Sequence, residues 1–142
     1  MKATELLKQD HEKVKGLIKK LKGEKKNRRQ LLDTIEQEIK VHSQAEEEIF
    51  YPAMEPYQES LVSEFNEEHQ EVDNLLAELV EGGETAGDFD EKVKRFEESL
   101  LHHIEEEEGQ MFPEAEKQLK DQLNELGAQI ASLKEDALGE VA

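Results

Sequence analysis

Six polar residues interrupt the apolar stripes of four helical segments in this sequence. Each segment has one histidine where the stripe calls for an apolar residue, and in the second and fourth segments a glutamate follows four residues later. Residues four apart share a face of a helix, so each glutamate points the same way as its histidine. The six residues are His11, His42, Glu46, His69, His103 and Glu107. Imidazole and carboxylate groups facing the inside of a helical bundle predict a metal site.

The simpler alternative to metal is a buried polar network. A single inward histidine is more often a hydrogen-bonded core residue than a ligand, and a single inward glutamate more often reflects a misassigned helix face. Six such residues in matched positions are different, because two uncompensated buried carboxylates would offset much of the stability of a domain. A network of histidine–glutamate pairs compensates this cost only in part. Metal compensates it fully and explains why all four segments contribute.

The ligand types narrow the choice of metal. Four imidazoles and two carboxylates favour iron, manganese or zinc, since calcium and magnesium prefer oxygen ligands almost exclusively. A closed structural zinc site needs only four ligands. Six ligands therefore fit two metal ions that share the carboxylates and an oxo or hydroxo bridge, with room left for a small exogenous molecule. Such an open, redox-capable centre suits small diatomic molecules or peroxide.

The elements that must position these residues are helical, and no strand pattern occurs in the sequence. We expect helices over about 4–22, 27–52, 58–81 and 88–113, with a fifth along the apolar stripe after Pro113. Thr4, Asn27 and Asp88 are the expected N-terminal caps, the last two in capping-box patterns with Gln30 and Glu91. Pro52 is expected to close the second helix.

An internal repeat organises these helices into two similar halves. Asp10-His11-Glu12-Lys13-Val14 resembles Glu68-His69-Gln70-Glu71-Val72, and the segment from His42 to Pro52 resembles the segment from His103 to Pro113. The offset is about sixty residues, so each half is a helix pair. We therefore predict an all-α fold, an up-and-down antiparallel four-helix bundle over residues 1–113. Residues 114–142 are predicted to form an additional C-terminal helix, packed on the bundle or at an oligomer contact of a monomer or homodimer.

Composition excludes several classes of function. The chain has 142 residues, with 36 acidic and 18 basic residues, no cysteine and a formal net charge of −18. This charge opposes binding to nucleic acids and to anionic membrane surfaces. The sequence has no run of 18 apolar residues, so no membrane segment is expected. Without cysteine there is no disulfide framework, zinc ribbon or thiol nucleophile, and we expect a cytoplasmic protein.

The order of the six residues resembles the hemerythrin-like (HHE cation-binding) family. A histidine is followed by His-x-x-x-Glu, another histidine, and His-x-x-x-Glu running on to Phe-Pro, over about Thr4 to Pro113. The resemblance implies a non-haem di-iron centre ligated by the six residues, with Glu46 and Glu107 bridging. It further implies that the centre binds dioxygen, as in that family, where some members act on peroxide or nitric oxide or in iron signalling.

Two departures separate the sequence from the oxygen-carrying hemerythrins. Those carriers have a second histidine in the third helix, where this sequence has Asp73, and their last acid follows its histidine by five residues, whereas here it follows by four. One imidazole fewer implies irons that are more open and more equivalent. This argues against reversible oxygen carriage and favours oxidant sensing or turnover, including catalase-like decomposition of peroxide. Asp73 is expected to lie on a solvated helix flank and not to be a seventh ligand.

Four residues beside the predicted ligands are expected to have lesser roles. The helical register places His102 on the polar side, exposed to solvent. Asp10 and Glu68 each precede a predicted ligand, and adjacent side chains diverge by about 100° on a helix, so contacts with the imidazoles are not the favoured interpretation. Tyr51 is expected to be an amphipathic rim residue, which is more common than a hydrogen bond to a bound oxygen species.

Other interpretations remain open to different degrees. A ferritin-like di-iron site needs Glu-x-x-His, and the residues three before each candidate histidine are Lys8, Ile39, Asn66 and Leu100, so this alternative fails. His-Glu-x-x-His is absent, which excludes that class of zinc protease. An oxygen or iron carrier or storage bundle without turnover remains possible. A metal-free helical interaction module that uses the stripe after Pro113 leaves six inward polar residues unexplained.

Overall fold

The computed structural model describes residues 1–139, and this range contains helices and turns but no strand. The helices are α1 (Ala3–Gly23), α2 (Arg28–Ala45), η1 (Glu46–Phe50), α3 (Tyr51–Gly82), α4 (Phe89–Glu106), η2 (Glu107–Met111), α5 (Phe112–Gln118) and α6 (Leu123–Leu138). The prediction of an all-α protein is confirmed. Residues 140–142, the last of the expected C-terminal segment, lie outside the described range.

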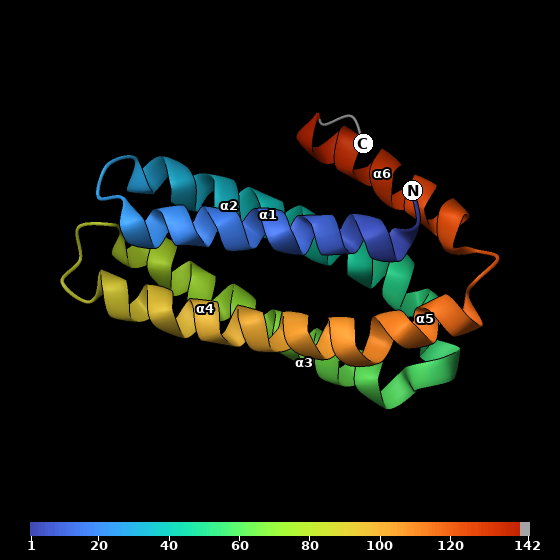
Figure 1. Ribbon diagram of the computed structural model, residues 1–142. Coiled ribbons are helices and arrows are strands. Elements are labelled where there is room, and N and C mark those ends of the chain that lie inside the picture. The colour runs from blue at the N-terminus through green and yellow to red at the C-terminus, as the bar shows by residue number, and fades with distance from the viewer. Residues whose placement is uncertain (140–142) are drawn as a thin grey trace.

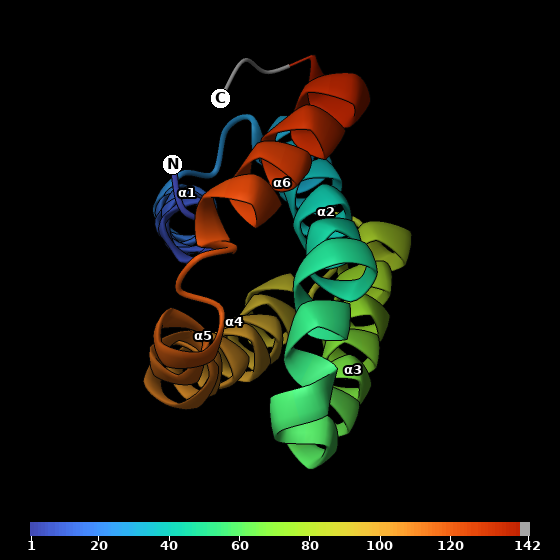
Figure 2. The same ribbon diagram turned by 90° about the vertical axis from the view of Figure 1, so that its right-hand side faces the viewer.

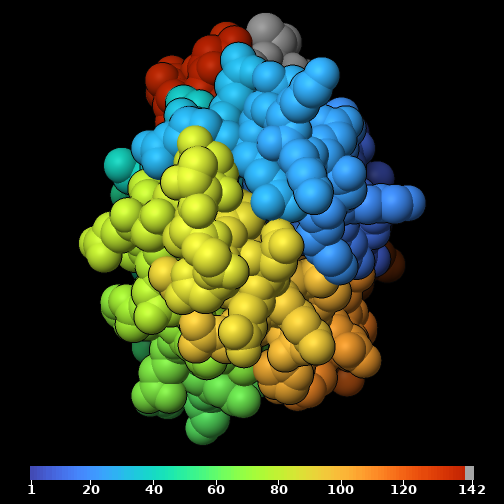
Figure 3. Space-filling model, turned by 90° about the vertical axis from the view of Figure 1, so that its left-hand side faces the viewer, coloured from blue at the N-terminus to red at the C-terminus, as the bar shows by residue number. Residues whose placement is uncertain are grey.

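Four long helices, α1 to α4, lie side by side (Figure 1). Each contacts its neighbours around a closed ring, α1 with α2, α2 with α3, α3 with α4 and α4 with α1. The α1–α2 and α3–α4 connections meet at one end (Figure 3). There Arg28 lies over the Phe89 ring, 5.1 Å from its centroid, and 3.3 Å from the Asp90 carboxylate. This contact ties the two halves of the repeat together.

The three expected N-terminal caps do not form. Thr4 lies inside α1, and its hydroxyl donates a hydrogen bond to Glu116 at 2.6 Å. Asn27 precedes α2 with φ at 62°, and its side chain makes no cap hydrogen bond. Asparagine tolerates this left-handed conformation, so Asn27 acts as a turn residue. Asp88 precedes α4, also without a side-chain cap. The helices begin near the expected residues, but packing and turn geometry fix those starts.

Pro52 does not close the second helix. It lies in the first turn of α3, which continues directly from η1, so the proline falls where the π turn has already displaced the regular hydrogen-bond pattern. The helical path continues past Pro52 and breaks at Gln58, which has φ −144° and ψ 53°. That break coincides with the expected start of the third helix, and it follows Pro56 by two residues.

A π-helical turn follows α2, and another follows α4. They are η1 and η2, and each starts at one of the two inward glutamates, Glu46 and Glu107. A π turn holds more residues than an α turn, so side chains beyond it are rotated relative to a regular α-helix. Phe50 and Tyr51 consequently point into the core, while Ile49, one residue earlier, is only half-buried. Such turns frequently mark functional sites.

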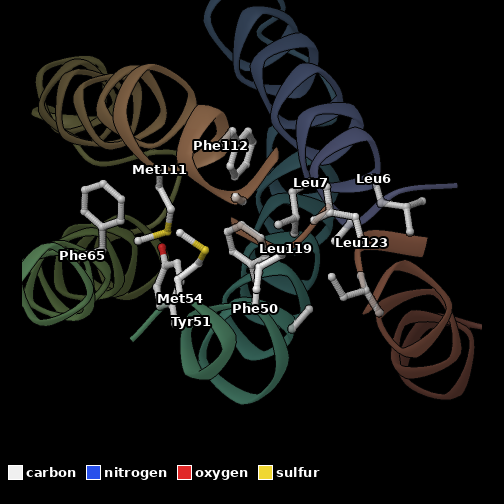
Figure 4. Packing of buried hydrophobic residues seen from close by; sticks show 14 of the residues in the cluster. Leu6, Leu7, Phe50, Tyr51, Met54, Phe65, Met111, Phe112, Leu119 and Leu123 are labelled. Atoms are coloured by element: carbon white, nitrogen blue, oxygen red, sulfur yellow. The ribbon is translucent and has the colours of Figure 1, made fainter. Parts of the chain in front are cut away.

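The core has two apolar clusters with a polar layer between them. One cluster includes Leu7, Tyr51, Phe65 and Phe112 and lies toward α5 and α6 (Figure 4). The other lies toward the two connections and includes residues such as Val14. In α1, α2 and α3 the predicted histidine falls where the chain passes from one cluster to the other, and after α4 the change falls at Glu107, between Ile104 and Met111. The bundle therefore has a polar middle layer with an apolar cluster on either side.

The C-terminal helix α6 packs on the bundle. It contacts α1, α2 and η1 and leans across the ends of α1 and α2 (Figure 2). Leu123 and Ile130 from the expected apolar stripe are buried there, and Leu126 and Leu133 are partly buried. Gly127 allows the closest approach, because a Cβ at this position would lie 2.0 Å from the Met1 carbonyl oxygen and 3.0 Å from the Ala3 nitrogen. Within the described residues, no helix is both long and apolar enough to cross a membrane.

Replacing Gly127 tests how α6 is held. Gly127→Ala forces a methyl group against the backbone of residues 1–3, and we expect it to lower the free energy of unfolding by about 1–3 kcal/mol, as overpacking does. Gly16→Ala is the matched control, since a Cβ at this exposed position in α1 meets nothing within 4 Å. The control should stabilise α1 by up to about 1 kcal/mol. Thermal and urea unfolding measure both, and equal stability of the two variants would contradict the close packing of α6.

Candidate metal centre

All six sequence-predicted residues meet in the middle layer of the bundle. Each long helix supplies one imidazole, from His11, His42, His69 and His103, and the two π turns supply Glu46 and Glu107. They form two groups, each with four ligand atoms within 4.8 Å of one another. The first group is His11, His42, Glu46 and Glu107, and the second is Glu46, His69, His103 and Glu107. Each group has two imidazoles, and both groups share both carboxylates.

The inner nitrogen of every imidazole points at the shared carboxylates. Glu46 Oε1 lies 3.2 Å from His42 Nε2 and 3.0 Å from His69 Nε2. Glu107 Oε1 lies 3.1 Å from His11 Nε2, and Glu107 Oε2 lies 3.5 Å from His103 Nε2. Both glutamates are fully buried, at 0% exposure. The ligand atoms thus converge from four helices on a small central volume.

The outer nitrogen of every imidazole contacts a second carboxylate. The four Nδ1–oxygen distances are 2.6 Å for His11–Glu108, 2.9 Å for His42–Asp10, 2.8 Å for His69–Glu47 and 2.7 Å for His103–Glu68. An ionised carboxylate only accepts hydrogen bonds, so each Nδ1 carries a proton and donates it. This fixes the ring orientation and leaves each Nε2 as the atom that can bind a metal.

The expectation for Asp10 and Glu68 is therefore wrong, for a geometrical reason. Neither carboxylate contacts the histidine that follows it, because adjacent side chains on a helix diverge. Instead Asp10 reaches from α1 to His42 in α2, and Glu68 reaches from α3 to His103 in α4. The divergence of adjacent side chains within one helix is what lets each carboxylate reach the neighbouring helix.

Glu47 and Glu108 were missed from the sequence altogether. Each directly follows an inward glutamate, and each contacts an imidazole of the other half of the repeat, His69 and His11 respectively. The signal that could have found them is the repeat itself, in which Glu46-Glu47 corresponds to Glu107-Glu108. The outer contacts obey the same pseudo-twofold relation as the inner residues.

Tyr51 is not a rim residue. It is 1% exposed, because the π turn η1 rotates it toward the middle layer. Its hydroxyl donates a hydrogen bond to Glu107 Oε2 at 2.5 Å and lies 3.1 Å from His69 Nε2 and 3.3 Å from His103 Nε2. The corresponding residue in the other half of the repeat is Phe112, whose ring stacks on His11. The two groups consequently differ, since only the second has a phenol beside it.

The electrostatics of the layer favour positive charge. Burial lowers the pKa of His69, but the carboxylates around it outweigh this effect, and hydrogen bonds to Glu46 and Glu47 raise the pKa of His69 to about 10. Glu46 and Asp10 likewise raise the pKa of His42 well above its ordinary value. Burial, together with the charges of Glu107 and Glu46, raises the pKa of Tyr51 well above its ordinary value, so its hydroxyl keeps its proton.

Unsatisfied atoms at the centre test whether these residues fit a metal. Within the described residues, His11 Nε2, Glu46 Oε2 and Glu107 Oε1 are buried and make no hydrogen bond. Buried polar atoms normally have a partner, and leaving one without costs free energy. All three residues belong to the two groups, and the three atoms are of the nitrogen and carboxylate types that bind iron, manganese or zinc. The residues present therefore fit a metal centre.

A small cavity of about 20 Å³ adjoins the imidazoles on the side away from Tyr51. The four histidines line it together with apolar side chains that include Val14, Ile39, Val72 and Leu100. A cavity can hold one water molecule when the space open to the centre of that molecule is roughly 10–15 Å³. This space accordingly accepts a molecule of two or three atoms and no organic substrate.

Two further sequence expectations concern residues outside this layer. His102 points to solvent, with its side chain 68% exposed, as its register indicated. It lies 2.8 Å from Glu106 and 3.9 Å from Glu68, in a third and partly exposed group of possible ligands. Asp73 is exposed and belongs to none of the three groups.

Known proteins resemble the chain over most of its length. The profile of the hemerythrin HHE cation-binding domain matches residues 2–115. A crystal structure of a hemerythrin HHE cation-binding domain-containing protein from Mycobacterium kansasii has a similar fold, with a TM-score of 0.88 and 28% sequence identity. The match covers 98% of this chain and 88% of the mycobacterial chain.

Two relatives extend this comparison. An uncharacterized protein of Mycobacterium tuberculosis is 30% identical over 117 residues, which cover 80% of this chain and 71% of that protein. A DNA nickase of a Nostoc species is 25% identical over 115 residues, which cover 79% of this chain and 33% of that protein. The chain thus spans about a third of the length of the Nostoc protein.

The sharing of both carboxylates by both groups predicts an unequal effect of ligand substitutions. Glu46→Gln removes a charged oxygen from both groups, so we expect it to weaken binding of two Zn²⁺ ions per chain, each at least about tenfold. His42→Ala removes a ligand from the first group only and should weaken one ion selectively. Calorimetric titration and metal analysis measure this difference.

The matched control is Glu48→Gln, two residues farther along and exposed. It should bind two ions as the unmodified protein does. Loss of only one ion in Glu46→Gln, or of both in His42→Ala, would contradict the shared arrangement.

Proposed function

The chain belongs to the hemerythrin HHE cation-binding domain family, as its histidine and glutamate spacing indicated, and from this premise we propose that it binds dioxygen, peroxide or nitric oxide at two iron ions in its middle layer. The observation that carries the proposal is the pair of four-residue groups that share Glu46 and Glu107. In the proposal these glutamates bridge the ions, within an up-and-down bundle that α6 extends as an additional helix. His11 and His42 hold one ion, and His69 and His103 hold the other.

Bound iron supplies one-electron redox chemistry and Lewis acidity at such a site. The protein supplies orientation and charge. The outer carboxylates keep a proton on each Nδ1, so every Nε2 faces inward and is the atom that would give up its proton and bind an ion. The buried anions Glu46 and Glu107 attract cations into a layer that is closed to solvent on both sides by apolar clusters.

The size and lining of the cavity support a small oxidant as the ligand. About 20 Å³ beside four imidazoles admits a diatomic molecule or peroxide, and its apolar wall limits water. Nitric oxide and dioxygen are apolar enough to enter such a space. This supports oxidant handling over an organic substrate.

Tyr51 supports turnover or sensing over simple oxygen carriage. Its hydroxyl proton lies at the second group, hydrogen-bonded to Glu107 Oε2, and remains on the oxygen at neutral pH because the pKa of Tyr51 is raised. The cavity lies on the other side of the imidazoles, so this proton would reach a reduced oxygen species there through Glu107, whose carboxylate accepts the hydrogen bond and would pass the proton on as general acid. Proton delivery is what decomposition of peroxide requires and what a reversible carrier does without.

The nickase activity of the Nostoc relative is not part of this proposal. The chain spans a third of that protein, and its net charge of −18 repels the phosphates of DNA. In the proposal the middle layer and its small ligand account for the function.

Iron loading and peroxide consumption test the proposal together. Protein purified from iron-replete cells should hold about two iron ions per chain, with ferric charge-transfer absorption in the near ultraviolet. The iron form should consume hydrogen peroxide and the metal-free form should not. Fewer than about one iron per chain would contradict the metal assignment. A stable, reversible oxygen adduct without peroxide consumption would instead identify a carrier.

Tyr51→Phe separates the proton donor from the metal ligands in the same assay. Iron content should stay at that of the unmodified protein, while the rate of peroxide consumption falls by about 100-fold, the low end of what a positioned general acid contributes. Tyr57→Phe is the control, because Tyr57 is 46% exposed. Loss of iron in Tyr51→Phe, or an unchanged rate, would overturn the role given to the phenol.

A further inference from the structure

Helix α6 reaches the middle layer through a single charged side chain. Lys134 Nζ contacts Asp10 Oδ1, and the two side chains are only 14% and 5% exposed. The other oxygen, Asp10 Oδ2, accepts the hydrogen bond from His42 Nδ1 at 2.9 Å. A continuous chain of contacts, Lys134–Asp10–His42, thus runs from the C-terminal helix to one imidazole of the first group.

The second group has no such connection. The residue corresponding to Asp10 is Glu68, which accepts a hydrogen bond from His103 Nδ1 at 2.7 Å. The other oxygen of Glu68 faces His102, which is exposed and belongs to α4 itself. Among the described residues, α6 therefore adds its charge to one half of a pseudo-symmetric centre and leaves the other half facing solvent.

The consequence for His42 follows from the burial of Asp10. A buried carboxylate needs partners for both oxygens, and removing one partner of a buried ion pair is costly because the remaining charge stays desolvated. Without the ammonium group, Asp10 Oδ1 loses its partner and the carboxylate is no longer held in the orientation that faces His42. This weakens the hydrogen bond that orients the imidazole of His42. Loss of such an outer hydrogen bond typically lowers metal affinity by about 10–100-fold.

We propose that Lys134 is a positioning residue that acts through Asp10 on His42, so that docking of α6 selectively strengthens cation binding at the His11/His42 half of the centre. The inference rests on the proposed metal centre and adds that its two halves differ in their affinity for a cation. It also assigns a role to the helix that follows the four-helix part of the chain. Through Lys134, helix α6 holds Asp10 in place and so orients His42 in one half of the centre.

The test compares three lysine substitutions in the full chain loaded with Zn²⁺. Lys134→Met keeps the aliphatic stem and removes the charge, Lys134→Arg restores a charge, and Lys120→Met removes an exposed charge elsewhere. Transfer of zinc to a coloured chelator should show one of the two ions leaving about tenfold faster in Lys134→Met. Lys134→Arg should recover most of this difference, and Lys120→Met should match the unmodified protein.

The ¹⁵N NMR signals of the imidazoles identify the half that changes. Lys134→Met should shift the His42 signals and leave those of His103 in place, with unchanged helix content by circular dichroism. Gly127→Ala, which displaces α6 while keeping Lys134, should accelerate loss of the same ion. Equal acceleration of both ions would show a general structural effect and overturn the inference, as would no acceleration at all.

The NMR comparison also distinguishes failure of this inference from failure of the proposed metal centre. If the unmodified protein binds fewer than two zinc ions, the metal centre is wrong. The Lys134–Asp10–His42 chain is then still tested by the His42 signals of the metal-free protein. Unchanged His42 signals in metal-free Lys134→Met would overturn the positioning role whatever the metal content.

Discussion

The structure depends on two carboxylates that are buried completely. Glu46 and Glu107 have no exposed surface, and each has an oxygen without a hydrogen bond. Burying these charges would cost much of the free energy of folding without positive charge nearby. Every long helix brings one imidazole to within 3.5 Å of them. The two apolar clusters can form only above and below this layer. The carboxylates therefore determine both where the core divides and why four helices must meet at one level.

A few of the many acidic residues in the sequence surround the imidazoles of the middle layer. Most of the 36 acidic residues solvate the exterior, but an inner pair faces the centre and an outer set of four holds the imidazole Nδ1 atoms. The outer set consists of Asp10, Glu47, Glu68 and Glu108. Anions on both sides of an imidazole stabilise a cation at or beside it. The layer thus attracts positive charge whichever metal ion binds there.

Helical periodicity was sufficient to predict part of this structure from the sequence. The inward stripes, the four histidines and the two glutamates follow from residues three and four apart. The contacts of Asp10 with His42 and of Glu68 with His103 do not, because they depend on how neighbouring helices face each other. Tyr51 was misplaced because its burial depends on the π turn η1, which shifts the register, and the one mark of it in the sequence, Pro52 two residues beyond the turn, was interpreted as a helix end. Long-range geometry and local register shifts are what a single sequence reveals least.

The central claim is that two cations share Glu46 and Glu107. Anomalous X-ray diffraction from crystals of the iron-loaded protein tests it most directly, because it locates each iron ion independently of the chain. Our account predicts two peaks in the middle layer, one beside His11 and His42 and the other beside His69 and His103, with both carboxylates between them. A single peak, or peaks confined to the partly exposed group around His102, would contradict it.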